Sequence, residues 1–76
     1  MHFPQYRKYT NGGSYFKIIS DREFIELQIV GANVLEHRVI AHQFPEQRTI
    51  LDMLEMDQDR WETISSFEFE KMWNSI

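Results

Sequence analysis

The sequence predicts an α+β domain, in which an antiparallel sheet of about four strands, or five, forms a meander packed against two helices in the C-terminal half. A glycine-rich turn joins two aromatic runs near the N-terminus, apolar and polar residues alternate through the middle of the chain, and two helix-type apolar stripes follow. Alternation is the period of a strand, whereas a spacing of three or four residues is that of a helix. The chain length suits one hydrophobic core, so residues 1–76 are expected to form a single globular domain.

The first expected element is a β-hairpin within residues 6–19. Its centre, Asn11-Gly-Gly13, contains residues that readily adopt the positive φ of a tight hairpin turn. The flanking tyrosine and isoleucine residues suit a pleated, half-buried surface. We therefore expect the fold to begin within the first ten residues, with no preceding leader segment.

Two further strands are expected in the middle of the chain. Ser20 and Glu23 match a capping box, but the alternation over 24–30 is typical of a strand, so we expect a capped turn that leads into that strand. Gly31-Ala-Asn33 supplies the next turn, and residues 33–42 alternate again. One face of this last stretch is the more apolar and is expected to point to the core: Leu35, His37, Val39 and Ala41.

The alternation stops at Phe44-Pro-Glu46, where a proline and an acid suit the first turn of a helix. The residues that follow predict an amphipathic helix over 45–56 that ends near the polar residues 57–59. Its apolar side is expected to contain Ile50, Leu51, Met53, Leu54 and Met56. Residues 61–64 are expected to form a short strand or an extended link.

The last expected element is a helix over 65–75. Ser65 and Glu68 form a capping box, and Ile64 and Phe69 occupy the two positions of a hydrophobic staple. A stripe of apolar residues then follows at helical spacing: Phe69, Met72, Trp73 and Ile76. We expect this helix to lie across the sheet and to close a single core.

Composition restricts the function classes. The chain has no cysteine, which excludes disulfides, thiolate nucleophiles and cysteine-based metal sites. A cysteine-free domain of this size favours a reducing compartment, and no apolar run approaches the roughly 20 residues of a membrane span. We therefore expect a cytoplasmic protein without a membrane segment.

Charge is distributed unevenly along the chain. Residues 1–19 carry three basic residues and no acid, whereas the remainder carries twelve acids against five basic residues, for a net charge of −4. The basic residues lie among aromatic ones in the first hairpin, and Tyr and Arg are frequent anchors in interfaces. These residues, hereafter the hairpin patch, form our candidate interaction surface: Tyr6, Arg7, Lys8, Tyr9, Tyr15 and Lys17.

No catalytic, metal-binding or cofactor-binding set is predicted. His37 and His42 are five residues apart, so on one strand they would point to opposite faces. The acidic run that includes Asp57 and Asp59 lacks the glycine and the spacing of a calcium loop. No nucleophile elbow, phosphate-binding glycine loop or zinc-binding helix motif occurs.

By elimination, we expect a non-catalytic protein that binds an unknown protein partner or assembles as a homo-oligomer through an open sheet edge and the hairpin patch. A first alternative is a weak nucleic-acid-binding domain, in which the tyrosines stack on bases and the cations contact phosphates. The acidic net charge weighs against it. A second alternative, a small enzyme or ligand-binding domain, would need a pocket that joins His37 or His42 to an acid.

Six short segments follow one another along the chain: Tyr15-Phe-Lys-Ile-Ile-Ser, Glu23-Phe-Ile-Glu-Leu-Gln, Phe44-Pro-Glu-Gln-Arg, Ile50-Leu-Asp-Met-Leu, Trp61-Glu-Thr-Ile-Ser and Phe67-Glu-Phe-Glu. Read in this order, they resemble a group of short, single-domain bacterial proteins of unassigned function. The resemblance implies a cytoplasmic stand-alone domain and assigns no functional residue.

Overall fold

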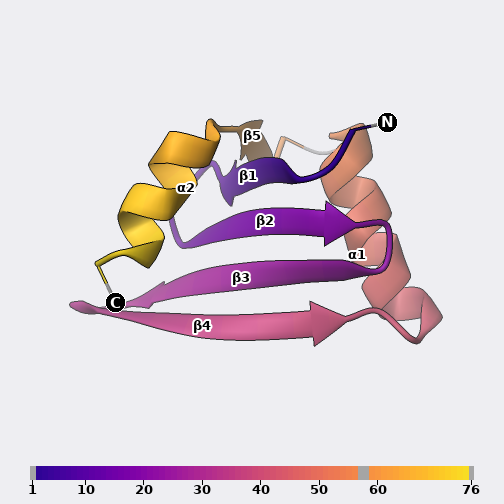
Figure 1. Cartoon of the computed structure of the whole chain (residues 1–76), viewed down its shortest axis with the longest axis horizontal. Helices are drawn as coiled ribbons and strands as arrows, with labels where there is room; N and C mark the ends of the chain where they lie inside the picture. The colour runs from indigo at the N-terminus through magenta and orange to yellow at the C-terminus, as the bar shows by residue number, and fades with distance from the viewer. Residues whose placement is uncertain (1, 57–58, 76) are drawn as a thin grey trace.

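One antiparallel sheet of five strands, with two helices, makes up the computed structural model, which describes residues 2–56 and 59–75 (Figure 1). The elements are β1 (Gln5–Tyr9), β2 (Ser14–Ser20), β3 (Glu23–Val30), β4 (Asn33–Ile40), α1 (Phe44–Glu55), β5 (Trp61–Thr63) and α2 (Ser66–Trp73). The spatial order of the strands is β4-β3-β2-β1-β5. The predicted α+β class with both helices in the C-terminal half is confirmed.

The turns between the first four strands follow the sequence prediction. Gly12 in the β1–β2 turn has φ +78° and Gly31 in the β3–β4 turn has φ +61°, a region that residues with a Cβ rarely adopt. Between β2 and β3, the Arg22 backbone N–H donates to the Ser20 hydroxyl at 3.1 Å. Ser20 thus caps the turn as expected, but the donor is Arg22 rather than Glu23, and β3 begins at Glu23, one residue earlier than predicted.

β5 occupies a position that the order of the elements along the chain does not predict. It pairs antiparallel with β1, with Tyr9 opposite Trp61, and forms the edge of the sheet farthest from β4. The β1–β2 hairpin therefore lies inside the sheet rather than at its edge. The two edges of the sheet are β4, with eight residues, and β5, with three.

α1 begins one residue earlier than predicted, with Pro45 in its first turn and Glu46 at its positive end. Its last residue is Glu55, and the capping residue Met56 has φ +58° and donates its N–H to the Asp52 carbonyl at 2.9 Å. Leu51 differs from the prediction, because its side chain is 46% exposed on the outer side of the helix. The predicted polar helix end at residues 57–58 lies outside the described residues.

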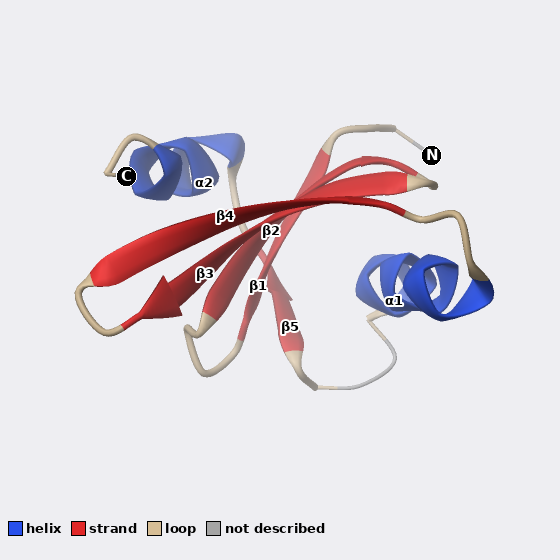
Figure 2. Cartoon of the chain, turned by 90° about the horizontal axis from the view of Figure 1, so that it is seen from below, coloured by secondary structure: helices blue, strands red, loops and turns tan. Residues whose placement is uncertain are grey.

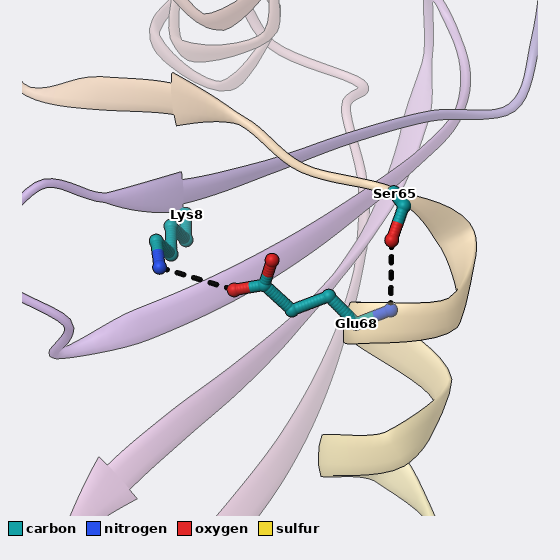
Figure 3. Close-up of polar contacts among 3 residues, drawn as sticks. All are labelled: Lys8, Ser65 and Glu68. Carbon is teal, nitrogen blue, oxygen red and sulfur yellow. Dashed lines mark hydrogen bonds and ion pairs between the residues drawn. The ribbon is translucent and has the colours of Figure 1, made fainter.

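α2 has the N-cap that the sequence predicts, but only one half of the capping box forms. The Ser65 hydroxyl accepts from the Glu68 backbone N–H at 3.1 Å, whereas the Glu68 carboxylate accepts from the Lys8 ammonium at 3.0 Å (Figure 3). The side chain of Glu68 thus ties the helix start to β1 instead of bonding back to the cap. Of the predicted apolar stripe, Ile76 lies outside the described residues.

Replacing the capping residue, Ser65→Ala, is expected to lower the free energy of unfolding by about 1 kcal/mol, because the first turn of α2 loses one bonded N–H. Urea denaturation followed by circular dichroism measures this loss. Ser66→Ala is the matched control, since Ser66 is exposed and is the first residue of the helix rather than its cap. Equal stability of the two variants would contradict the cap assignment.

The two helices lie on opposite faces of the sheet, so the structure has two apolar clusters where the sequence predicted one core (Figure 2). Alternation divides each strand between them, as in β3, where Phe24 points to one face and Ile25 to the other. The α1 cluster contains the buried residues Phe16, Ile18, Phe24, Ala41, Ile50, Met53 and Trp61. The α2 cluster contains Ile25, Leu27 and Phe69, with Tyr6, Tyr15, Ile19, Val34, Ile64, Met72 and Trp73 packed against them.

The face of β4 that we expected to be buried is covered only at one end. Val39 packs against the α1 cluster and Ala41 belongs to it, but Leu35 is 45% exposed and His37 is exposed as well. α1 covers one end of this face and leaves the other end, toward the β3–β4 turn, open (Figure 2). Within the described residues, neither helix has the length and the apolar character needed to cross a bilayer.

Candidate interaction surfaces

Strand alternation divides the hairpin patch between the two faces of the sheet. Arg7 and Tyr9 point to the face covered by α1, whereas the other members point to the face covered by α2. The side chains on the α2 face are Tyr6, Lys8, Tyr15 and Lys17. The six residues therefore do not form one continuous surface.

Arg7 is a structural residue on the α1 face, where only 6% of its surface is exposed. Its Nε donates to the Met53 carbonyl at 3.0 Å, and its two Nη groups donate to the Tyr6 carbonyl at 2.8 Å and to Gln5 Oε1 at 2.7 Å. Met53 lies in the last turn of α1, where carbonyls lack helical partners and the helix dipole favours a cation. Burial lowers the pKa of Arg7.

The members of the patch on the α2 face are engaged with α2 or with the apolar cluster beneath it. Lys8 pairs with Glu68, and this hydrogen bond raises the pKa of Lys8 above its ordinary value (Figure 3). The Lys17 ammonium lies over the Trp73 ring, 5.4 Å from its centroid. Tyr6 packs on Phe69 with the ring centroids 5.5 Å apart, and burial is the larger cause of its raised pKa. All three cations of the patch thus have partners within the chain.

A shallow groove of about 470 Å³ runs between α2 and the hairpin. Its walls carry charges of both signs beside apolar atoms, and its lining residues are Tyr15, Glu68, Lys71, Met72 and Ser75. Four of its five lining residues have polar side-chain groups, and one of these groups, the Glu68 carboxylate, is already paired with Lys8.

The outer edge of β4, hereafter the β4 edge, is the second candidate surface. In the described parts of the chain no strand pairs with it, and Figure 1 shows it as a free border of the sheet. Large apolar side chains are exposed on or beside it: Val30 (47%), Leu35 (45%), Ile40 (50%) and Phe44 (74%). The sequence did not predict this surface, because Leu35 was expected in the core and the candidate interaction residues were placed on the first hairpin.

The polar groups near His37 form two separate hydrogen-bonded pairs. The His37 ring bonds to the Gln28 side chain at 3.2 Å, whereas the Ser14 hydroxyl donates to Glu26 at 2.7 Å. Ser14 and His37 are therefore not joined to each other as in a serine–histidine pair, in which the histidine accepts the hydroxyl proton. Among the residues that the structure describes, no group of three acids or histidines is placed to hold a metal ion.

The structure thus offers two candidate surfaces. The side chains of the hairpin patch pack against or bond to the α1 and α2 sides of the fold, whereas the β4 edge pairs with no described strand and has exposed apolar side chains. No family model, curated protein or solved structure was found to match this chain.

Proposed function

We propose that this protein is a non-catalytic interaction module that binds its partner by strand addition at the β4 edge. An open strand of eight residues offers a row of backbone donors and acceptors to which a second strand can bond. Four exposed apolar side chains on or beside this edge are the observation that carries the proposal. They follow the strand from one end to the other, with Val30 and Leu35 toward the β3–β4 turn and Ile40 and Phe44 toward α1, so an added strand would contact them in succession.

The opposite edge of the sheet is a weaker candidate. β5 has only three residues, and the two that follow Trp61, Glu62 and Thr63, are polar and exposed. Short edge strands with charged side chains are a common means of preventing strand addition. The contrast favours β4 as the binding edge.

Site-specific photocrosslinking in the source cell tests this proposal. A photoreactive phenylalanine analogue at Ile40, on the β4 edge, is expected to give covalent adducts with a protein partner. The same analogue at Leu51, which is similarly exposed but lies on α1, is expected to give few. Adducts that form equally at both positions, or at Leu51 alone, would place the interface elsewhere.

The same photocrosslinking experiment also tests the alternative that the protein binds nucleic acid. If the analogue at Tyr15 gave adducts that nuclease treatment removes, the hairpin patch would be the binding surface. The partners of Lys8, Lys17 and Arg7 within the chain weigh against that result.

A further inference from the structure

The backbone of β4 alternates between groups that bond to β3 and groups that point outward. The Ala41 N–H donates to the Arg22 carbonyl at 2.7 Å, and Val30 lies opposite Asn33 across a two-residue turn, so the odd-numbered residues bond to β3. The even-numbered residues therefore present N–H and C=O to the free edge: Val34, Glu36, Arg38 and Ile40. The Ile40 carbonyl also accepts from the His42 N–H.

Two copies of β4 that run antiparallel to each other have complementary sequences. With His37 opposite His37 of a second copy, Glu36 lies opposite Arg38, and Arg38 opposite Glu36. Both members of these pairs have outward backbone groups, so each pair can exchange two backbone hydrogen bonds. The outer pairs are apolar: Val34 with Ile40 and Leu35 with Val39.

Other registers lose this complementarity. A shift by two residues in one direction places Glu36 opposite Glu36 of the second copy, and in the other direction Arg38 opposite Arg38. Like charges directly opposite on neighbouring strands are destabilising. A shift by one residue sets outward backbone groups against inward ones, so the ladder does not form. Among these registers, the one centred on His37 satisfies both the charges and the backbone, and it also pairs the largest number of β4 residues.

Glu36 and Arg38 each bond to a residue of their own chain and keep further polar atoms for a partner. Trp73 Nε1 donates to one carboxylate oxygen of Glu36 at 2.8 Å, and the other oxygen carries no contact from a described residue. Arg38 uses its Nε for Glu23 at 3.3 Å, and its side chain is 59% exposed. The Nη groups of Arg38 make no hydrogen bond to a described residue and are left for a carboxylate of the partner.

We propose that the partner at the β4 edge is a second copy of this chain, paired antiparallel with β4 about a two-fold axis that passes between the two His37 residues. This inference rests on the proposed function and names its partner. The two sheets join into one continuous sheet, and the exposed apolar residues of each copy, Leu35 and Ile40, pack against Val39 and Val34 of the other. The interface is isologous, as two-fold symmetry requires.

The expected affinity is modest. An eight-residue strand spans roughly 26 Å, and the interface is a single strand pair with its flanking side chains. Protein–protein interfaces that bury so little surface are weak or transient, so we expect a dissociation constant of about 10–100 µM. Sedimentation velocity over a concentration series from about 1 µM to 1 mM covers this range.

Charge reversal tests the register directly. Glu36→Arg alone sets two like-charged arginine pairs across the axis, and Arg38→Glu alone sets two glutamate pairs. Each variant by itself is expected to self-associate roughly tenfold to thirtyfold more weakly than the wild type. An equimolar mixture of the two variants is expected to form a heterodimer at wild-type strength, because every charged pair is then complementary.

The mixture also controls for folding, since rescue requires that both variants are folded. Glu62→Lys, on the opposite edge strand, is the matched control and is expected to leave self-association unchanged. A wild-type protein that stays monomeric up to about 1 mM would overturn the inference, as would a mixture that forms no heterodimer. Adducts to other proteins at Ile40 would still support strand addition in that case, so the two proposals fail separately.

Discussion

Replacing Phe69 by alanine is expected to lower the free energy of unfolding by about 3–5 kcal/mol, because it removes a fully buried ring and leaves a cavity that the surroundings fill only partly. Phe69 is the one residue of α2 in the buried part of the α2 cluster. Its ring lies 5.5 Å from both the Tyr6 and the Trp73 rings. A domain of this size has a total stability of roughly 4–11 kcal/mol, so the loss is a large share of it.

Urea denaturation monitored by tryptophan fluorescence measures this effect. Phe67→Ala is the matched control, since Phe67 lies on the same helix two residues away and is 75% exposed. The control is expected to change stability by less than about 0.5 kcal/mol. Similar losses in the two variants would contradict the assignment of Phe69 as the residue that attaches α2 to the sheet.

The second large effect is expected for Arg7→Lys, which keeps the charge but replaces a guanidinium by a single ammonium. The Met53 carbonyl, the Tyr6 carbonyl and the Gln5 side chain share three donors of Arg7, and one ammonium in a rigid, buried position does not reach all of them. Leaving such acceptors unpaired is expected to cost about 2 kcal/mol of unfolding free energy. Chemical denaturation measures it.

Lys8→Arg provides the control for this prediction. Lys8 is the next residue on β1, points to the opposite face and forms a partly exposed ion pair that arginine can also form. Its replacement is expected to leave stability nearly unchanged. If Arg7→Lys were equally harmless, Arg7 would act through its charge alone rather than through directed hydrogen bonds to the end of α1.

Most elements of the fold could be predicted from local patterns. Gly12 and Gly31 identify two turns, and Ser65 identifies the start of α2, because each effect acts within a few residues along the chain. The pairing of β5 with β1 could not be predicted, because Trp61 and Tyr9 are neighbours only through the folded chain. The same holds for the placement of the helices, since both faces of the sheet carry apolar residues and either could receive α2.

The candidate site was predicted less well. Alternation correctly placed Leu35 on the same face as Val39, but α1 covers only one end of that face and leaves Leu35 exposed. Arg7 looked like a surface cation because its burial depends on Met53, which is 46 residues away in sequence. The sequence did contain one signal for the β4 edge. If a second copy of this strand runs antiparallel with His37 opposite His37, Glu36 lies opposite Arg38 and the flanking residues are apolar.

Polar residues beside the buried ones of β3 protect the alignment of this strand, although both faces of the sheet are covered by helices. A one-residue slip of a strand moves every side chain to the opposite face. In β3 such a slip would put Glu26 or Gln28 in the place of Leu27, inside the buried α2 cluster. Gly12 and Gly31, whose positive φ values suit tight turns, fix the same alignment at the turns of the β1–β2 and β3–β4 hairpins.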